Sequence, residues 1–321
     1  MRHLRHLGNR ISVPITADEG GFTGRECPNP ECEGYFKIVS GTGLEGDGLP
    51  CHCPYCGHTS DHDKFWTQEQ IRYAKSVAMR RISDAIRKDL KSLEFDQKPR
   101  GPFGIGLSVE VKAGAPLPIH HYREMELETT VVCSSCTLRY AVYGAFAFCP
   151  DCGQHNSQQI LGANLDVVQK MLDLAESHDG DLRVKLIENA LQDCVSAFDA
   201  FGRELCRVHA DRTSSPAAMN RMRFQYLVHA RTELQAIGVE MTAAITTDAW
   251  VHALTLFQKR HLIAHKLGVA DQAYVDRSGD RDAVQGRKVR VSTDEVTELR
   301  NTLWTVAESL TAQFTNLATA R

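Results

Sequence analysis

The sequence predicts an α+β N-terminal domain followed by an all-α, up-and-down helical bundle. Four close pairs of cysteines, most of the glycines and prolines, and segments with strand-like alternation all lie before residue 158. After residue 157 the apolar side chains recur with the period of helices, and the only proline is Pro216. A chain of 321 residues, 42% of them hydrophobic, is long enough for two domains that each have a core. We therefore expect one domain over residues 1–157 and a second over residues 158–321.

Paired cysteines organise the first domain. Eight of the eleven cysteines form four short-loop pairs, and such pairs suit a metal ion better than a disulfide. Zinc takes four thiolates in a tetrahedron, and two cysteine knuckles linked by short strands make a zinc ribbon. One set with this spacing, with twelve residues between its two pairs, is Cys133, Cys136, Cys149 and Cys152. The sequence therefore predicts a double zinc-ribbon domain with two structural zinc ions, held by Cys27, Cys32, Cys53, Cys56, Cys133, Cys136, Cys149 and Cys152.

The first of these two sites is defined less tightly by the sequence. Its opening pair is separated by four residues, and a long glycine-rich stretch follows it. Cys51 and His52 lie close enough to Cys53 to replace it as a ligand, so the sequence leaves this choice open. The strings CPYCG and CPDCG are the same knuckle used twice, which indicates a weak internal repeat. Because four thiolates leave no open coordination position, both metals are expected to stabilise the fold and not to catalyse.

Between the two groups of cysteines, residues 66–93 predict a basic helix. Thr67 and Gln70 have the spacing of a capping box at its start. The string KPRGP at 98–102 predicts a stiff linker after it, and the alternation in LSVEVK at 107–112 predicts a strand. The excess of Lys and Arg on the helix fits either contacts to the phosphates of nucleic acid or a solvated face, and the second is more common.

The second domain is expected to contain about five helices, near residues 160–178, 181–211, 219–237, 247–267 and 293–319. Gly238 and Gly268 lie where two of these helices would end. The string STD at 292–294 supplies a cap for the last one. Cys194 and Cys206 lie within a helical pattern and are predicted to be buried thiols. Helices of this length joined by short connections predict an up-and-down bundle.

One predicted helix, in the string FQKRHLIAHKLG, carries Arg260, His261 and His265 inside an apolar pattern. The simplest interpretation is structural, because basic residues near a helix C-terminus interact favourably with the helix dipole. A metal site is disfavoured, because the glutamate of a zinc-protease helix is missing between the two histidines. The histidines share a face, whereas Arg260 lies about 140° around the helix from His265. Two copies packed across a two-fold axis would bring both kinds of residue to one cleft.

The longer segment LFQKRHLIAHKLGVADQAYVDRSG resembles the signature helix and following loop of HEPN domains. These domains are helical bundles marked by an Arg that is followed directly by a polar residue and a few residues later by a His. Arg260, His261 and His265 match this pattern, and the continuation through Tyr274 resembles that of many bacterial members. The string VSAFDAFGREL resembles the family's first long helix, which often carries an acidic residue facing the site, here Asp199. The resemblance covers roughly residues 160–321.

The resemblance implies a metal-independent endoribonuclease that cleaves RNA as a homodimer. It implies a toxin or antiviral defence effector with an antitoxin or regulatory protein as partner, and catalytic roles for Arg260, His265, His261 and Asp199. The chemistry is consistent, because imidazole can take a proton from a ribose 2′-OH or give one to the leaving oxygen at neutral pH. Arginine can hold the charge of the phosphorane. The alternative is a non-catalytic adaptor, in which the zinc ribbons bind nucleic acid or protein and the bundle serves for dimerisation.

Charge and the N-terminal segment bear on where the protein acts. The net charge of −3 means that any surface for nucleic acid must be local. The first residues contain no apolar run typical of a signal peptide, and no stretch reaches the ~20 apolar residues of a membrane span. Metal-binding cysteines also fit a reducing compartment. We therefore expect a cytoplasmic protein that makes no contact with a membrane, and the resemblance to HEPN domains implies RNA as its partner.

Overall fold

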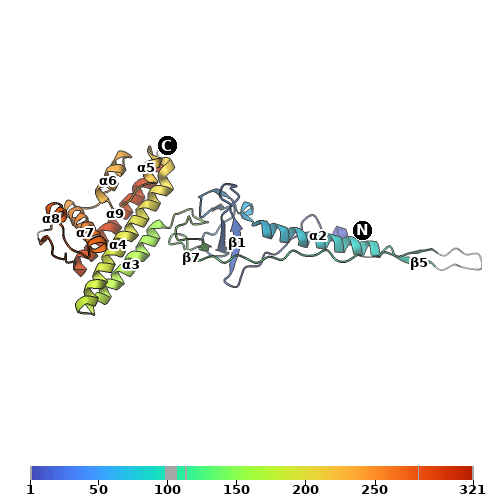
Figure 1. The fold of residues 1–321 in the computed structure, drawn as a ribbon. Coiled ribbons are helices and arrows are strands. Elements are labelled where there is room, and N and C mark those ends of the chain that lie inside the picture. The colour runs from blue at the N-terminus through green and yellow to red at the C-terminus, as the bar shows by residue number, and fades with distance from the viewer. Residues whose placement is uncertain (1, 98–106, 113, 281, 320–321) are drawn as a thin grey trace, which may run out of the picture. The chain divides into compact units, whose positions relative to one another are not determined.

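The computed structural model describes residues 2–97, 107–112, 114–280 and 282–319, and the chain folds as two compact units (Figure 1). The units are Met1–Gln154, which contains small sheets and the paired cysteines, and His155–Arg321, which is helical. This agrees with the predicted order of an α+β part followed by a helical part. Within the described ranges, no helix combines the length and the apolar character that crossing a membrane requires.

A four-stranded antiparallel sheet, in the order β1-β2-β8-β7, forms the centre of the N-terminal unit. Its strands are β1 (Phe22–Glu26), β2 (Tyr35–Val39), β7 (Thr129–Val132) and β8 (Arg139–Val142). A separate hairpin follows β2 and runs into a 3-10 turn; its elements are β3 (Pro50–His52), β4 (Thr59–Asp61) and η1 (His62–Phe65). The hairpins β1–β2, β3–β4 and β7–β8 each carry one cysteine pair in the turn, so the local sequence specifies each of these hairpins together with its cysteines.

The two ribbons are related by an approximate two-fold axis. Strands β2 and β8 pair antiparallel at the centre of the sheet, which gives β1 and β7 equivalent outer places. The two similar knuckles also pair reciprocally. The amide of His52 donates to the carbonyl of Pro150 at 2.7 Å, and the amide of Phe148 donates to the carbonyl of Pro54 at 2.8 Å. Each bond joins the residue before one knuckle to the proline inside the other, so the weak sequence repeat corresponds to a structural duplication.

The core of this unit forms around the cysteines. Phe36, Phe65 and Tyr140 are among its fully buried side chains, and the rings of Phe36 and Phe65 meet edge to face with centroids 5.9 Å apart. Arg25 is also buried, and its guanidinium lies 4.4 Å from the centroid of the Trp66 ring. The cation–π contact offsets part of the cost of burying this charge.

The basic helix is α2 (Gln68–Lys91), and its predicted capping box is confirmed. The amide of Gln70 donates to Thr67 Oγ1, and the amide of Thr67 donates to Gln70 Oε1, both at 3.1 Å. Several basic side chains donate to backbone carbonyls of segments that lie along the helix; they are Arg80, Arg81 and Arg87. Part of the basic surface therefore holds the fold together.

Two smaller elements accompany this helix. The buried carboxylate of Asp89 accepts the amides of His3 and Leu4 at 2.8 and 2.9 Å and so caps the short helix α1 (Arg2–His6). Beyond α2, strands β5 (Phe95–Gln97) and β6 (Leu107–Val109) pair antiparallel. The strand expected over 107–112 is thus shorter than predicted, and the linker expected over 98–102 lies outside the described residues.

The C-terminal unit contains the expected long helices and some short ones between them. The long ones are α3 (Ser157–Glu176), α4 (Gly180–His209), α6 (Leu227–Ala236), α7 (Thr247–Lys266) and α9 (Thr293–Thr319). The short ones are η2 (Ala210–Arg212), α5 (Pro216–Met219) and α8 (Gln272–Arg277). The helix expected over 219–237 begins only at Leu227, because the amides of Phe224 and Gln225 bind the carboxylate of Asp199 instead of a preceding helical turn.

Helix α4 lies at the centre of this unit and contacts α3, α7 and α9 (Figure 1). Its buried stripe includes Phe198 and Phe201, which pack in one core with Phe224 and Phe314. The thiols of α4 are fully buried in the same core, as the sequence predicted; they are Cys194 and Cys206. The apolar stripe of α4 thus supports the helices that carry the candidate catalytic residues.

Candidate functional site

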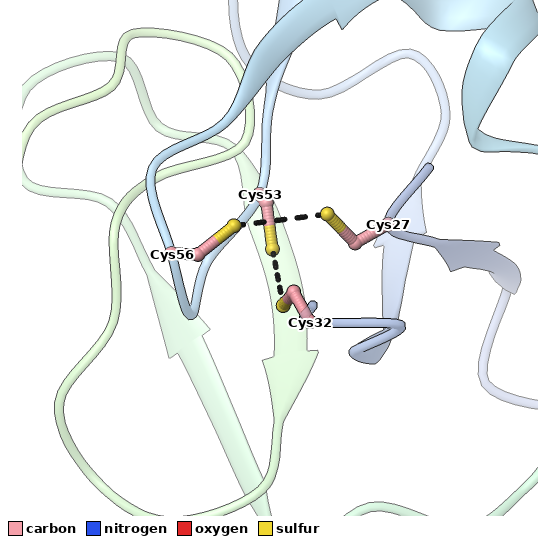
Figure 2. A group of neighbouring side chains, drawn as sticks. All are labelled: Cys27, Cys32, Cys53 and Cys56. Carbon is pink, nitrogen blue, oxygen red and sulfur yellow. Dashed lines mark hydrogen bonds between the residues drawn. The ribbon is translucent and has the colours of Figure 1, made fainter. Parts of the chain in front are cut away.

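The first group of cysteines lies between two hairpins of the N-terminal unit. Cys27 and Cys32 come from the turn between β1 and β2, and Cys53 and Cys56 come from the turn between β3 and β4. Figure 2 shows their sulfur atoms pointing toward one another. The Sγ atoms of Cys27 and Cys56 are 3.7 Å apart, as are those of Cys32 and Cys53. All four sulfur atoms lie within 4.8 Å of one another, so the two hairpins together present one compact ligand set.

The second group has the same arrangement. Cys133 and Cys136 come from the turn between β7 and β8, and Cys149 and Cys152 come from the knuckle that follows β8. The Sγ atoms of Cys133 and Cys152 are 3.6 Å apart, and those of Cys136 and Cys149 are 3.4 Å apart. The eight cysteines predicted from the sequence thus form two sets of four.

Each set fits one tetrahedral metal ion. With the metal–sulfur distance of ~2.3 Å found in zinc sites, a regular tetrahedron places its sulfur atoms ~3.8 Å apart. The closest sulfur pairs, at 3.4 to 3.7 Å, approach this value, whereas a disulfide requires about 2.05 Å. Burial raises the pKa of Cys27 to about 11, so four thiolates this close together are stable only around a cation. Two metal ions per chain are therefore compatible with the structure.

The backbone turns in the same way after every pair. The residue after the second cysteine has a positive φ in all four: 46° at Glu33, 69° at Gly57, 65° at Thr137 and 68° at Gly153. In the three Cys-x2-Cys pairs the amide of this residue donates at 3.0 Å to the carbonyl of the first cysteine. Glycine takes this conformation without a steric cost, but threonine does not. The left-handed Thr137 indicates that ligand geometry fixes the turn even against local preference.

The structure also shows which of Cys51, His52 and Cys53 belongs to the first group of four cysteines. Cys51 lies on β3 opposite Ser60, is fully buried, and is not part of either set. Burial raises the pKa of its thiol to about 12, which keeps it protonated at neutral pH. The ring of His52 is engaged through Nδ1 with Thr59 Oγ1 at 2.8 Å. Cys53 is therefore the residue placed to bind metal.

Helix α7 places His261 and His265 side by side in the C-terminal unit. Their ring centroids are 4.8 Å apart with the planes at 52°, and both side chains are exposed. The part of the His261 ring that is shielded from water, followed by electrostatic interactions with His265, Lys266 and Arg260, lowers the pKa of His261. A lowered pKa favours the neutral imidazole near pH 7, which can accept a proton.

Arg260 lies on a different side of α7. It is in line with Leu256 and Ile263, on the stripe that this helix turns toward the core. Its side chain is half-buried, and its Nε atom is buried without a hydrogen-bond partner among the described residues. Leaving a buried donor of a charged group unpaired is costly, so the position favours an acceptor from outside the single chain. Because Arg260 lies about 140° from His265 around the axis, one copy does not direct both at a single atom.

A cleft of about 680 Å³ adjoins the histidine pair. Segment 225–229, α7 and α8 line it, and His229, His261 and Lys266 are among the lining residues, whereas Arg260 and His265 are not. The structure thus brings one predicted catalytic residue, His261, into a cleft. His229 was missed by sequence reasoning, because a single histidine within a helical pattern carries no signal of its own.

Asp199 is buried on α4 and does not line this cleft. Its Oδ1 atom accepts the amides of Phe224 at 2.7 Å and Gln225 at 3.2 Å, and its Oδ2 atom lies 3.2 Å from Arg203 Nε. The carboxylate therefore fixes the backbone that leads into the cleft. This differs from the expectation that the residue faces the site directly.

Lys259 is a further residue that the sequence did not single out. It is buried next to Arg260, and its Nζ atom donates to the carbonyl of Arg290 at 2.9 Å and to Glu295 Oε1 at 2.8 Å. Asp280, whose carboxylate lies 3.9 Å from the same nitrogen, also accepts the hydroxyl of Tyr274 at 2.6 Å. Lys259 thus ties the segment after α8 to α7, through partners that are distant in sequence.

Among the described residues, only the two sets of cysteines bring three or more metal-binding side chains together. Comparisons of the chain with protein-family models, with curated proteins and with solved structures find no match.

Proposed function

We propose that the C-terminal unit is an endoribonuclease of the HEPN type that cleaves RNA without a metal cofactor and acts as a homodimer. The observation that carries the proposal is the end of α7, where His261 and His265 lie 4.8 Å apart beside a cleft and Arg260 has a buried, unpartnered Nε. The resemblance of residues 160–321 to HEPN domains supports the same conclusion. A half-buried arginine whose Nε has no partner among the described residues is a costly choice for a helix that needs only to pack.

The reaction is attack of a ribose 2′-OH on the adjacent phosphate. The 2′-oxygen loses its proton to a neutral imidazole as its bond to phosphorus forms. The bond from phosphorus to the 5′-oxygen breaks, and that oxygen gains a proton from an imidazolium. The products are a 2′,3′-cyclic phosphate and a 5′-hydroxyl. We assign proton transfer to His265, positioning of the phosphate to His261, and stabilisation of the phosphorane to Arg260, whose planar fork suits two phosphate oxygens.

The arrangement on α7 supports the proposal of a homodimer. Arg260 and His265 point to different sides of one helix, so a second copy is needed to place an arginine and a histidine at one phosphate. Asp199 enters this scheme as a positioning residue, because it holds the backbone at Phe224 and Gln225.

For the N-terminal unit we propose that both cysteine sets hold zinc and that the two ribbons recognise the target or a partner. The bond lengths of zinc and its preference for thiolate ligands fit the sulfur separations, which supports this choice of metal. Because four thiolates close the coordination sphere, the zinc ions would stabilise the fold and leave the chemistry to α7.

The test is sequencing of RNA ends after expression of the wild type and of His265→Ala. We expect fragments with cyclic phosphate ends from the wild type, and we expect the purified protein to produce them in Mg²⁺-free buffer as well. The variant should cleave RNA about 10²–10⁴-fold more slowly. His178→Ala is the matched control, since His178 is a half-buried histidine that also lies at a helix C-terminus, just after α3. Arg260→Lys should fail as well, because lysine keeps the charge but loses the fork.

A non-catalytic adaptor is the second candidate, and a specific observation favours it. Arg260 lies on the core-facing stripe of α7, where it can serve packing alone, and both metal sets are closed. Cleavage by His265→Ala at the wild-type rate would refute the catalytic role of this histidine, and no cleavage by the wild type, in a preparation free of other nucleases, would identify the bundle as a binding or dimerisation module.

A further inference from the structure

The cleft beside His261 has walls from three segments. Residues 225–229, which lead into α6, form one wall, α7 forms the second, and α8 contributes the third. Its volume of about 680 Å³ lies within the roughly 300–1,000 Å³ typical of small-ligand pockets. The cleft therefore has room for a single nucleotide, next to the histidines of the proposed ribonuclease.

The lining combines apolar surface with a few polar groups. Leu227, Leu254 and Phe257 provide apolar surface, and Tyr226, which also lines the cleft, is 66% exposed. An exposed tyrosine at a cleft is a stacking platform, because every nucleobase has a π-face that packs on an aromatic ring. Because this residue is mostly exposed, its ring does not serve the core.

Two residues with carboxamide side chains, Gln225 and Gln258, also line the cleft. The side-chain nitrogen Nε2 of Gln225 lies 3.4 Å from Asp199 Oδ2, and the backbone amide of Gln225 donates to Oδ1 of the same carboxylate. These two contacts hold the side chain of Gln225 in place. A carboxamide offers one donor group and one acceptor, the combination that matches the edge of an unpaired base. This gives the buried Asp199 a defined role, which is to orient a reading group.

We infer that this cleft binds one unpaired nucleobase of an RNA strand, stacked on Tyr226 and read by Gln225 and Gln258. The inference rests on the proposed function for its choice of RNA. A second copy of the chain is the competing occupant. It is disfavoured because the cores of protein interfaces are depleted of charged groups, whereas Lys266 and Asp271 line this cleft.

Binding is measured with 5′-fluorescein-labelled 2′-O-methyl heptamers of A, C, G and U, by anisotropy with the full-length protein. The methyl group blocks the attacking oxygen, so binding is read without cleavage. Tyr226→Ala should weaken binding by roughly 5- to 150-fold, and Tyr226→Phe should keep it, since stacking needs only the ring. Leu182→Ala is the control, because Leu182 is an exposed side chain of α4 that does not line the cleft. Gln258→Met should reduce the differences in affinity among the A, C, G and U heptamers, because methionine cannot form hydrogen bonds with a base edge as glutamine does.

Three results would overturn the inference. One is wild-type affinity in Tyr226→Ala. Another is no binding of any heptamer by the wild type. The third is that Tyr226→Ala separates a dimer in sedimentation without lowering affinity for RNA, which would assign the cleft to an interface between copies.

The two proposals fail separately. Binding that depends on Tyr226 without cleavage of unmodified RNA would refute the ribonuclease and leave the base site. Cleavage that depends on His265, with binding indifferent to Tyr226, would refute the base site and leave the ribonuclease.

Discussion

Cys51 and Cys53 offer a matched pair of substitutions that tests the first metal centre. Both side chains are fully buried and lie two residues apart, but only Cys53 belongs to the set of four. We expect Cys53→Ser to reduce the bound metal from two ions per chain to one. We expect Cys51→Ala to keep both ions.

The two substitutions should differ in how much stability they cost, for a structural reason. Cys51→Ala removes one buried atom, a change comparable to Ile→Val, and should cost about 0.5–1.5 kcal/mol. Cys53→Ser removes a thiolate whose sulfur lies 3.7 Å from that of Cys32, and with it the ion that joins two hairpins. Structural zinc in small domains binds with about 10–16 kcal/mol at pH 7, so loss of the ion should unfold the β3–β4 hairpin and the ligand turn after β1.

Elemental analysis of purified protein gives the metal content, and thermal unfolding followed by circular dichroism gives stability. Zinc at two equivalents in the wild type and in Cys51→Ala, and at one in Cys53→Ser, is the expected result. One equivalent in Cys51→Ala, with two retained in Cys53→Ser, would refute the ligand assignment. A wild-type content of one ion or none, without loss during handling, would refute the two-site arrangement.

Three further substitutions test other parts of the structure. Thr137→Gly should raise unfolding free energy by about 1 kcal/mol in denaturant titration, because φ is 65° there and glycine removes the strain; a loss of stability would contradict this. Burial of the ring, followed by the charge of Arg212, lowers the pKa of His209 to about 4. The stability that the neutral ring contributes above pH ~6.5 is therefore lost as pH falls through 4. His209→Phe should flatten the dependence of the unfolding free energy on pH, and an unchanged dependence would contradict this. Lys259→Met should cost about 1–3 kcal/mol, because the half-buried carboxylates of Glu295 and Asp280 lose their cation, whereas Lys185→Met, at an exposed lysine, should cost less than about 1 kcal/mol in the same titration.

Local chemistry allowed much of the fold to be predicted from the sequence. The capping box of Thr67 and Gln70 involves residues three apart, so its hydrogen bonds depend on little else. The eight ligands were identified because a Cys-x2-Cys turn orients two thiolates by itself. The helices that bury one apolar stripe, such as α4 and α9, were predicted close to their observed ends, since the 3.6-residue period records which face meets the core.

Contacts between distant segments decided the rest. Helix α6 begins at Leu227 and not near residue 219 because Asp199, from another helix, binds the intervening amides. Pairing of β2 with β8 turns a repeated knuckle into a two-fold arrangement, and only that pairing reveals the reciprocal bonds of His52 and Phe148. The choice of Cys53 over Cys51 and the burial of Lys259 depend on neighbours that a sequence pattern does not record, because a side chain's burial and partners are properties of the packed chain.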